Sequence, residues 1–233
     1  MDTLQSNNLS LINKNKWSEL HSSIKIDETL MEPTPSIKEI VLNNKSNNDK
    51  ILEIGCGYGR NINFLCENKF ANEYIEIDQT AESIAISNEL LVNYKNKISL
   101  SQMDASKKLL FDDNYFDVII DIMSAITFIP VKEGRDIYFQ EVYRTLKPGG
   151  IYYFLTSNIE GDISDRTDSK IVDGQFIRDF DKMVEKAYYR EELENYLRKF
   201  SSVSLNTRNE HYRAFGVKKF KRQNGFWFGI ARK

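Results

Sequence analysis

Two acidic residues, with a run of glycines between them, are the first candidates for chemistry in this chain. Glu53 lies inside a short apolar stretch, and Gly55, Gly57 and Gly59 follow it at alternate positions. Because a carboxylate buried in an apolar strand is costly without a partner, Glu53 indicates a nearby cationic group, such as the ammonium of a ligand. The glycines allow the backbone to turn sharply and to lie against that ligand. Asp78, about twenty residues past the glycines, is expected to accept hydrogen bonds from both hydroxyls of a ribose.

Three interpretations of the glycine loop compete. A phosphate-binding P-loop requires Lys and then Ser or Thr after its last glycine, whereas Arg60 and Asn61 follow here, so that interpretation is excluded. A dinucleotide motif has the spacing G-x-G-x-x-G, which is one residue longer than the spacing of this chain. The third interpretation is a structural turn in which Glu53 bonds to loop amides. The position of Glu53 favours a ligand loop that resembles, but does not match, the dinucleotide motif.

A second pair of candidates follows the strand expected over residues 98–102. Asp104 stands just past that strand, where its carboxylate can accept a hydrogen bond from the exocyclic amine of an adenine. The amide of Ala105 would then donate to the adenine ring. Alternatively, Asp104 caps the turn that follows. Both interpretations stay open at this point.

Candidates for the reaction itself are fewer. The chain has two histidines, His21 and His211. His211, with Tyr212 beside it, is the candidate general base, although a lone histidine next to a strand is often structural. Trp17, with Leu20 and His21, is expected to lie on one short amphipathic helix. Trp17 is a candidate to stack on a ligand and is equally suited to be a packing anchor, and Arg166 is a candidate to bind a polar substrate. No His, Cys and carboxylate residues have the spacing of a metal site.

The elements that must position these residues follow the order of an open α/β fold. Apolar strands alternate with helices at intervals that predict parallel strands and right-handed crossovers. One helix is expected after Thr34, with Pro35 in its first turn, and another is expected to stop at residues 147–150, KPGG. The connection over residues 157–188 is long, which is typical of functional loops, so it forms either an acceptor pocket or lid, or a solvated insertion with a short helix. The expected strands cover residues 51–54, 73–77, 98–102, 115–120, 151–156, 202–209 and 225–232.

Composition limits the classes of protein to be considered. The chain has 233 residues, a formal net charge of −2, 41% hydrophobic residues and a mean hydropathy of −0.49. No apolar run approaches the length of a membrane span, and the first residues do not resemble a secretion signal. The balance of charge argues against a protein that holds nucleic acid broadly. The two cysteines, Cys56 and Cys66, are interpreted as reduced thiols, so we expect a cytoplasmic protein without a membrane partner.

Four ordered segments of the chain resemble the class I S-adenosylmethionine-dependent methyltransferases. The segments are ILEIGCGYGR, IEID, QMDA with YFDVII, and LKPGG before a strand. Each segment alone is weak evidence for the resemblance, but the ordered set at this spacing is specific and covers the chain from about residue 45 to the end. A dehydrogenase would lack the C-terminal strand pair and the matching Glu53. The resemblance implies a Rossmann-like, mostly parallel seven-stranded sheet with an antiparallel last strand, helices on both faces and an N-terminal helical lid.

The resemblance also implies S-adenosylmethionine as cofactor and a set of residues that hold it. Glu53 and the first two glycines would hold its methionine end, Asp78 its ribose, and Asp104 with Ala105 its adenine. Asp121 and Ile122, after the fourth strand, would lie beside the methionine portion. The implied cofactor-binding residues are Glu53, Gly55, Cys56, Gly57, Asn61, Asp78, Gln79, Asp104, Ala105, Asp121 and Ile122.

An enzyme of this kind transfers a methyl group by in-line displacement. We expect a small-molecule nitrogen or oxygen acceptor, because the chain lacks the Asn-Pro-Pro-Tyr-like element typical of methyltransferases that act on base amines. An RNA or protein methyltransferase, or an S-adenosylmethionine-binding regulator without catalysis, stays open as an alternative. The expected organisation is a helical cap over residues 1–45 and a methyltransferase domain over residues 46–233, with a substrate-side insertion at residues 157–188. The sequence does not indicate an oligomeric state.

Overall fold

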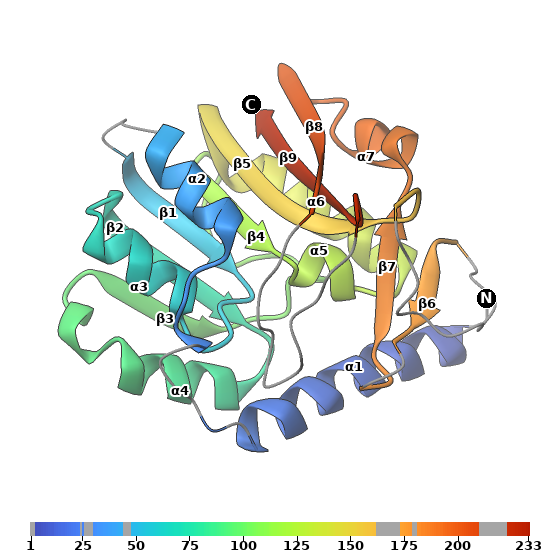
Figure 1. The fold of residues 1–233 in the computed structure, drawn as a ribbon, viewed down its shortest axis with the longest axis horizontal. Helices are drawn as coiled ribbons and strands as arrows, with labels where there is room; N and C mark the ends of the chain where they lie inside the picture. The colour runs from blue at the N-terminus through green and yellow to red at the C-terminus, as the bar shows by residue number, and fades with distance from the viewer. Residues whose placement is uncertain are drawn as a thin grey trace.

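A mostly parallel sheet with helices on both faces forms the body of the molecule (Figure 1). The computed structural model describes residues 3–23, 25, 30–43, 48–161, 173–178, 181–209 and 223–233. Its strands are β1 (Asn48–Ile54), β2 (Ala71–Asp78), β3 (Ile98–Gln102), β4 (Phe116–Ile122), β5 (Leu146–Asn158), β6 (Gln175–Ile177), β7 (Val184–Tyr188), β8 (Ser202–Arg208) and β9 (Phe226–Arg232). Its helices are α1 (Thr3–Ser23), α2 (Pro35–Asn43), α3 (Arg60–Glu67), α4 (Ala81–Leu90), the short 3₁₀ helix η2 (Val92–Tyr94), α5 (Ala125–Phe128), α6 (Lys132–Thr145) and α7 (Arg190–Tyr196).

The strand order confirms the predicted sheet. The first five strands are parallel and lie in the order β3-β2-β1-β4-β5. Strand β9 then pairs antiparallel with β5, and β8 pairs antiparallel with β9. The last strand in sequence therefore runs antiparallel to β5, as expected, while β6 and β7 extend the sheet to nine strands instead of the seven predicted. Parallel strands with right-handed crossovers bring the ends of β1, β2, β3 and β4 to one edge, where open α/β folds bind ligands.

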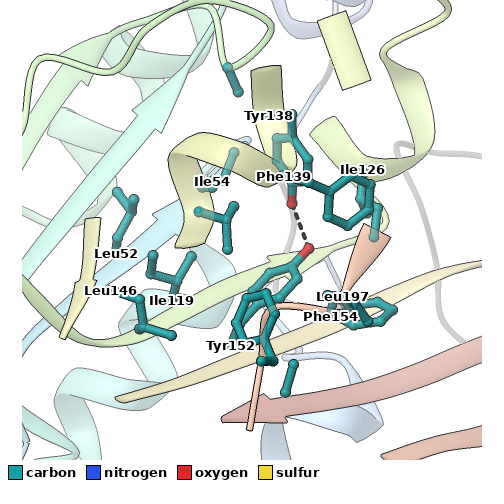
Figure 2. Packing of buried hydrophobic residues seen from close by; sticks show 14 of the residues in the cluster. Leu52, Ile54, Ile119, Ile126, Tyr138, Phe139, Leu146, Tyr152, Phe154 and Leu197 are labelled. Atoms are coloured by element: carbon teal, nitrogen blue, oxygen red, sulfur yellow. Dashed lines mark hydrogen bonds between the residues drawn. The ribbon is translucent and has the colours of Figure 1, made fainter. Parts of the chain in front are cut away.

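Two hydrophobic clusters hold the helices to the sheet, one on each face. On one face, Ile37 of α2 and Ile62 and Leu65 of α3 pack with Ile51 and Val118. On the other face lie residues of α5, α6 and α7, and Figure 2 shows Tyr138 and Tyr152 meeting there. Their hydroxyl oxygens are 2.6 Å apart. The central strands β1, β4 and β5 are buried on both faces over most of their length, which is why they read as apolar runs, whereas the edge strand β3 (ISLSQ) is only partly buried.

Local signals at two helix ends are confirmed. Helix α2 begins at Pro35, and the amide of Ile37 donates to the carbonyl of Thr34 at 3.0 Å. Helix α6 ends at Thr145, directly before the predicted stop. Strand β5, however, begins at Leu146 instead of residue 151, because Leu146 pairs with Phe116 before the register shifts across the KPGG stretch.

Two segments differ from the sequence expectations. Helix α1 has 21 residues, where a short helix around Trp17 was expected. The described part of the connection over residues 157–188 contains the hairpin of β6 and β7, and β7 is buried along its whole length. The interpretation of that part as a solvated insertion with a short helix is therefore wrong. Strand β7 extends the sheet by pairing with the last residues of β5.

Candidate functional site

A cavity of about 280 Å³ lies at the carboxyl edge of the parallel strands. Its wall comes from the glycine loop after β1, the ends of β2 and β4, the turn after β3, helix α1 and the β6–β7 hairpin. Of the predicted cofactor-binding and substrate residues, those on the wall are Trp17, Gly55, Cys56, Gly57, Asn61, Asp78, Gln79, Asp104, Ala105 and Ile122. The open α/β topology thus brings together residues that are far apart in the sequence.

The glycine loop has the backbone conformation that its residue types predict. Gly55, Gly57 and Gly59 have φ values of 74°, 57° and 79°, in the left-handed region that side chains disfavour. The amide of Gly55 donates to the carbonyl of Ile77 at 2.7 Å, which ties the loop to the end of β2. A Cβ atom at Gly55 would lie 1.4 Å from Oγ of Ser124, so glycine is required there for space as well as for backbone conformation.

Glu53 lies directly behind this loop and is 2% exposed. Its Oε1 accepts a hydrogen bond of 2.8 Å from Nδ2 of Asn61, whereas its Oε2 is buried without a hydrogen-bond partner. Burial raises the pKa of Glu53 to about 7. Asn61 is on the cavity wall and Glu53 is not, so Glu53 faces the site through Asn61.

Asp78 joins the loop to helix α4 and to helix α1. Its Oδ2 accepts from the amide of Gly57 at 3.2 Å, and its Oδ1 accepts from the amide and the hydroxyl of Thr80 at 2.9 and 3.0 Å. Nδ1 of His21 is 2.9 Å from the same hydroxyl. Because that hydroxyl gives its only proton to Asp78, Nδ1 of His21 must be the donor. Burial lowers the pKa of His21, so the ring is neutral with its proton on Nδ1.

Asp104 fits both interpretations of its role. Its Oδ1 caps the turn by accepting from the amide and hydroxyl of Ser106 at 2.9 and 2.6 Å. The other oxygen, Oδ2, takes no part in these bonds, and Asp104 and Ala105 both lie on the cavity wall.

The side chain of Asp121 is not on the cavity wall. It is fully buried inside β4 and accepts hydrogen bonds from the amides of Ser124 and Ile126 and from the hydroxyl of Tyr138, at 3.0, 2.9 and 2.7 Å. Burial raises its pKa to about 7. The carboxyl group therefore shapes the turn from β4 into α5, because the alternation along the strand directs it away from the cavity, and Ile122 reaches the wall instead.

Helix α1 closes one side of the cavity and runs past α4 and the β6–β7 hairpin (Figure 1). Trp17 stacks on His21 with ring centroids 5.6 Å apart and meets the edge of Phe128 at 5.0 Å. All three residues line the cavity, so Trp17 is both a packing anchor and part of the wall. Asn13 fixes the helix: its Nδ2 donates to the carbonyls of Phe128 and Val184, and its Oδ1 accepts from the amide of Val184.

Replacing Asn13 by alanine is expected to lower the free energy of unfolding by about 2–3 kcal/mol, because three buried hydrogen bonds are lost and their backbone partners stay buried. Thermal denaturation measures the loss, and hydrogen exchange of the amides of α1 locates it. Asn72→Ala is the matched control, because Asn72 is exposed and its side chain donates to Asp49 at the surface. Equal melting temperatures for the Asn13 variant and the control would contradict this role for Asn13.

The β6–β7 hairpin contributes a charged side to the cavity. Arg178 pairs with Asp181, lies 3.8 Å from Oε2 of Glu185, and stacks over Phe128 at 4.7 Å. Glu185 is completely buried and bonds to the hydroxyl of Ser157. Arg178, Asp181 and Glu185 line the same cavity as the glycine loop and Asp104. Within the described residues, no cluster of three or more His, Cys, Asp or Glu side chains is arranged to hold a metal ion.

Sequence reasoning missed several residues of the wall. Glu185 had no usable signal, because it stands beside Lys186 in the mixed stretch VEKAY. Phe128 and Ser124 likewise carried no signal in the sequence. The candidate base His211 and the candidate substrate residues Arg166 and Tyr212 lie outside the described residues, and their roles stay predictions.

The methyltransferase-domain family model matches residues 51–150. An arsenite methyltransferase of Aquipseudomonas alcaligenes is 28% identical over 113 residues, which are 45% of this chain and 32% of that protein. A ubiquinone biosynthesis O-methyltransferase of Pelagibacter ubique is 29% identical over 111 residues, 48% of this chain and 43% of that protein. The chain thus spans less than half the length of these curated relatives.

Among solved structures, an S-adenosylmethionine-dependent methyltransferase from Methanosarcina mazei superimposes with a TM-score of 0.64. The match covers 87% of this chain and 98% of that one at 21% identity, so it establishes the fold. The matched domain contains the glycine loop, Asp78, Asp104 and Ile122, which are the part of the cavity wall supplied by β1 to β4. Residues 51–150 thus match a methyltransferase domain, and the fold is similar to that of S-adenosylmethionine-dependent methyltransferases of known structure.

Proposed function

We propose that this protein transfers a methyl group from S-adenosylmethionine to a nitrogen or oxygen atom of a small polar molecule. The observation that carries the proposal is a single cavity lined both by the glycine loop, Asp78 and Asp104 and by Arg178 and Glu185 of the β6–β7 hairpin. A donor and an acceptor must meet in one enclosed space for direct transfer, because alignment of the reactants supplies much of the rate.

The residues on the donor side fit S-adenosylmethionine. Glu53 has a buried carboxylate oxygen without a partner behind the loop, which suits a cationic amino group. Asp78 offers a carboxylate for the ribose, and Asp104 with Ala105 offers an acceptor and a donor for the adenine. Apolar side chains around them suit the faces of the adenine, and they are Ile77, Met103 and Ile129. When bound, the donor supplies a methyl group on a positively charged sulfur.

The charge of the wall favours a neutral or cationic acceptor. Four carboxylates and two guanidinium groups line the described wall: Asp78, Asp104, Asp181, Glu185, Arg60 and Arg178. This acidic surface attracts the cationic donor and repels phosphate groups. It argues for a small molecule and against RNA. Two curated relatives are likewise named for small acceptors or their pathways, arsenite and ubiquinone biosynthesis.

On the acceptor side, Arg178 and Glu185 would orient the acceptor, and Trp17 with Phe128 would cover its apolar part. Glu185 can also accept a proton from an acceptor amine or hydroxyl. His211 remains the proposed alternative base.

In the proposed organisation, residues 1–45 form the cap and residues 157–188 form the substrate-side insertion of a methyltransferase domain over residues 46–233. Within the described part, no helix is both long and apolar enough to cross a membrane. The two cysteines are free and buried, which supports a reducing compartment such as the cytoplasm.

The direct test is turnover with a panel of small amines, alcohols and carboxylic acids, measured as S-adenosylhomocysteine formed. We expect amines or hydroxyl compounds to be methylated and multiply charged anions to be inert. His211→Ala and Glu185→Gln are compared with the unmodified protein for both turnover and donor affinity. The proposed base is the residue whose replacement lowers kcat while the donor affinity is unchanged. Tight donor binding without turnover on any acceptor would favour a regulator, and strongly salt-sensitive RNA binding would favour an RNA enzyme.

A further inference from the structure

Two acidic side chains lie next to each other behind the glycine loop. Glu53 of β1 and Glu76 of β2 are register partners in the parallel pair. Paired residues of adjacent strands point to the same face of a sheet, and here that face is covered by α3. Glu53 is 2% exposed and Glu76 is completely buried. The sheet therefore holds two carboxyl groups side by side, away from water.

Most oxygens of the Glu53–Glu76 pair lack an N–H or O–H donor. Asn61 donates to Oε1 of Glu53, and the weakly donating thiol of Cys56 acts on Glu76. No N–H or O–H donor reaches Oε2 of Glu53 or either carboxyl oxygen of Glu76. Two ionised carboxylates in this position would repel each other in a poorly solvated environment, so the pair must carry a proton or face a cation. A purely structural role explains this arrangement poorly, because apolar side chains would fill the same space at a lower cost.

The electrostatic surroundings of the pair also favour its protonated form. Burial raises the pKa of Glu53 to about 7 and raises that of Glu76 well above its ordinary value of 4.5. Negative neighbours add to both shifts, and Arg60 and Asn61 partly oppose the shift of Glu53. The titratable and charged groups that act on the pair or lie beside it are Cys56 and Asp78 at the loop, Arg60 and Cys66 on α3, and Asp121 on β4.

We propose that Glu53 and Glu76 act together as a proton-exchanging pair that couples donor binding to pH. The pair holds a proton when no donor is present and releases it when the cationic donor binds at the loop. In this step the O–H bond of one carboxyl group breaks and the proton passes to the buffer, with no change in oxidation state. Glu76 is a positioning residue in this account, because it lies one layer behind Asn61 and the cavity wall. The inference rests on the proposed function.

Proton release has a defined consequence for affinity. If about one proton leaves for each donor bound, the association constant rises about tenfold for each pH unit below the pKa of the pair. The inert neighbour for comparison is Glu73, which is on the same strand but is exposed and paired with Lys50. Glu76→Gln keeps the shape of the side chain and removes its titration, whereas Glu73→Gln removes an exposed carboxylate.

Isothermal titration calorimetry with S-adenosylmethionine at pH 7, in phosphate and in Tris, tests the coupling. The two buffers differ in their heat of protonation, so the difference in binding heat counts the protons released. We expect release of about one proton for the unmodified protein and for Glu73→Gln, and a marked reduction for Glu76→Gln. Donor binding without proton release, or with equal release in Glu76→Gln, would overturn the inference and leave the proposed function standing. No donor binding at any pH would contradict the proposed function itself.

A second measurement needs no donor. Because the folded chain keeps a proton on Glu76 that the unfolded chain loses above pH about 4.5, the melting temperature should fall as the pH rises above that value. In Glu76→Gln the contribution of residue 76 to this fall is absent. The variant should therefore have a higher melting temperature than the unmodified protein at pH 8, and the difference should disappear near pH 4. Parallel melting curves for the two proteins across this range would contradict the buried, proton-holding state of Glu76.

Discussion

Replacing Asp78 by alanine is expected to weaken binding of S-adenosylmethionine by about 100-fold, because two hydrogen bonds from ribose hydroxyls to a carboxylate contribute about 3 kcal/mol together. The same change removes the acceptor for the amide of Gly57 and for Thr80. The loop and the start of α4 should therefore loosen as well. Calorimetric titration with the donor and with S-adenosylhomocysteine measures the loss.

Two further variants separate donor binding from folding. Asp78→Asn keeps the size of the side chain and one carbonyl oxygen for Thr80, so it should melt closer to the unmodified protein and still bind the donor weakly. Asp112→Ala changes an exposed aspartate far from the cavity wall and should leave affinity unchanged. Donor affinity in Asp78→Ala within twofold of the control would remove Asp78 from the ribose site.

Gly55→Ala is expected to destabilise the fold by about 2–4 kcal/mol and to abolish donor binding at ordinary concentrations. The new Cβ would lie 1.4 Å from Oγ and 2.5 Å from Cβ of Ser124, and the backbone φ of 74° already disfavours a side chain. Either the loop after β1 or the turn after β4 must move, and both form the cavity wall. Thermal denaturation and donor titration measure the two effects.

Gly149 supplies the matched control for the backbone contribution. It has nearly the same φ, 79°, but a Cβ there would meet nothing within 4 Å. Gly149→Ala should cost about 1 kcal/mol and leave donor binding unchanged. Adding Ser124→Gly to the Gly55 variant removes the colliding atoms and should recover the part of the loss that exceeds this control. If the double variant is as unstable as Gly55→Ala alone, the collision with Ser124 is not the cause.

The part of the cavity wall formed by the glycine loop and Asp78 could be predicted from the sequence because its determinants are local. The glycines need an unusual backbone conformation, and Asp78 ends a strand at a fixed interval after them, so residue type and spacing carry the information. The direction of a side chain at a strand end is less certain. Asp121 was expected beside the methionine, but it turns to Tyr138 and the amides of the β4–α5 turn.

The part of the cavity wall formed by the β6–β7 hairpin could not be predicted, because its residues contradict the usual relation between polarity and exposure. Strand β7 reads VEKAY, yet all five residues are buried. Lys186 reaches Glu192 at 2.7 Å, and Glu185 bonds to Ser157, so tertiary partners stabilise charges that the sequence alone assigns to the surface. Helix α1 is similar, since polar Asn13 and His21 make its contacts to the body.

Glu76 is the clearest case of information that only the fold supplies. The sequence EYIEID marks a strand, but β2 is an internal strand covered on both faces, so polarity does not indicate which side chains are exposed. Only the register of β1 and β2 reveals that Glu76 stands beside Glu53.

The most direct test of the central claim is a crystal structure of the protein with S-adenosylhomocysteine. The account predicts the ribose hydroxyls within hydrogen-bond distance of the Asp78 carboxylate, the amino-acid end at residues 55–57 and the adenine between Asp104 and Ile129. The sulfur should face the side of the cavity formed by Arg178 and Glu185. A nucleoside bound elsewhere, or one bound here with its sulfur turned away from the β6–β7 hairpin, would contradict it.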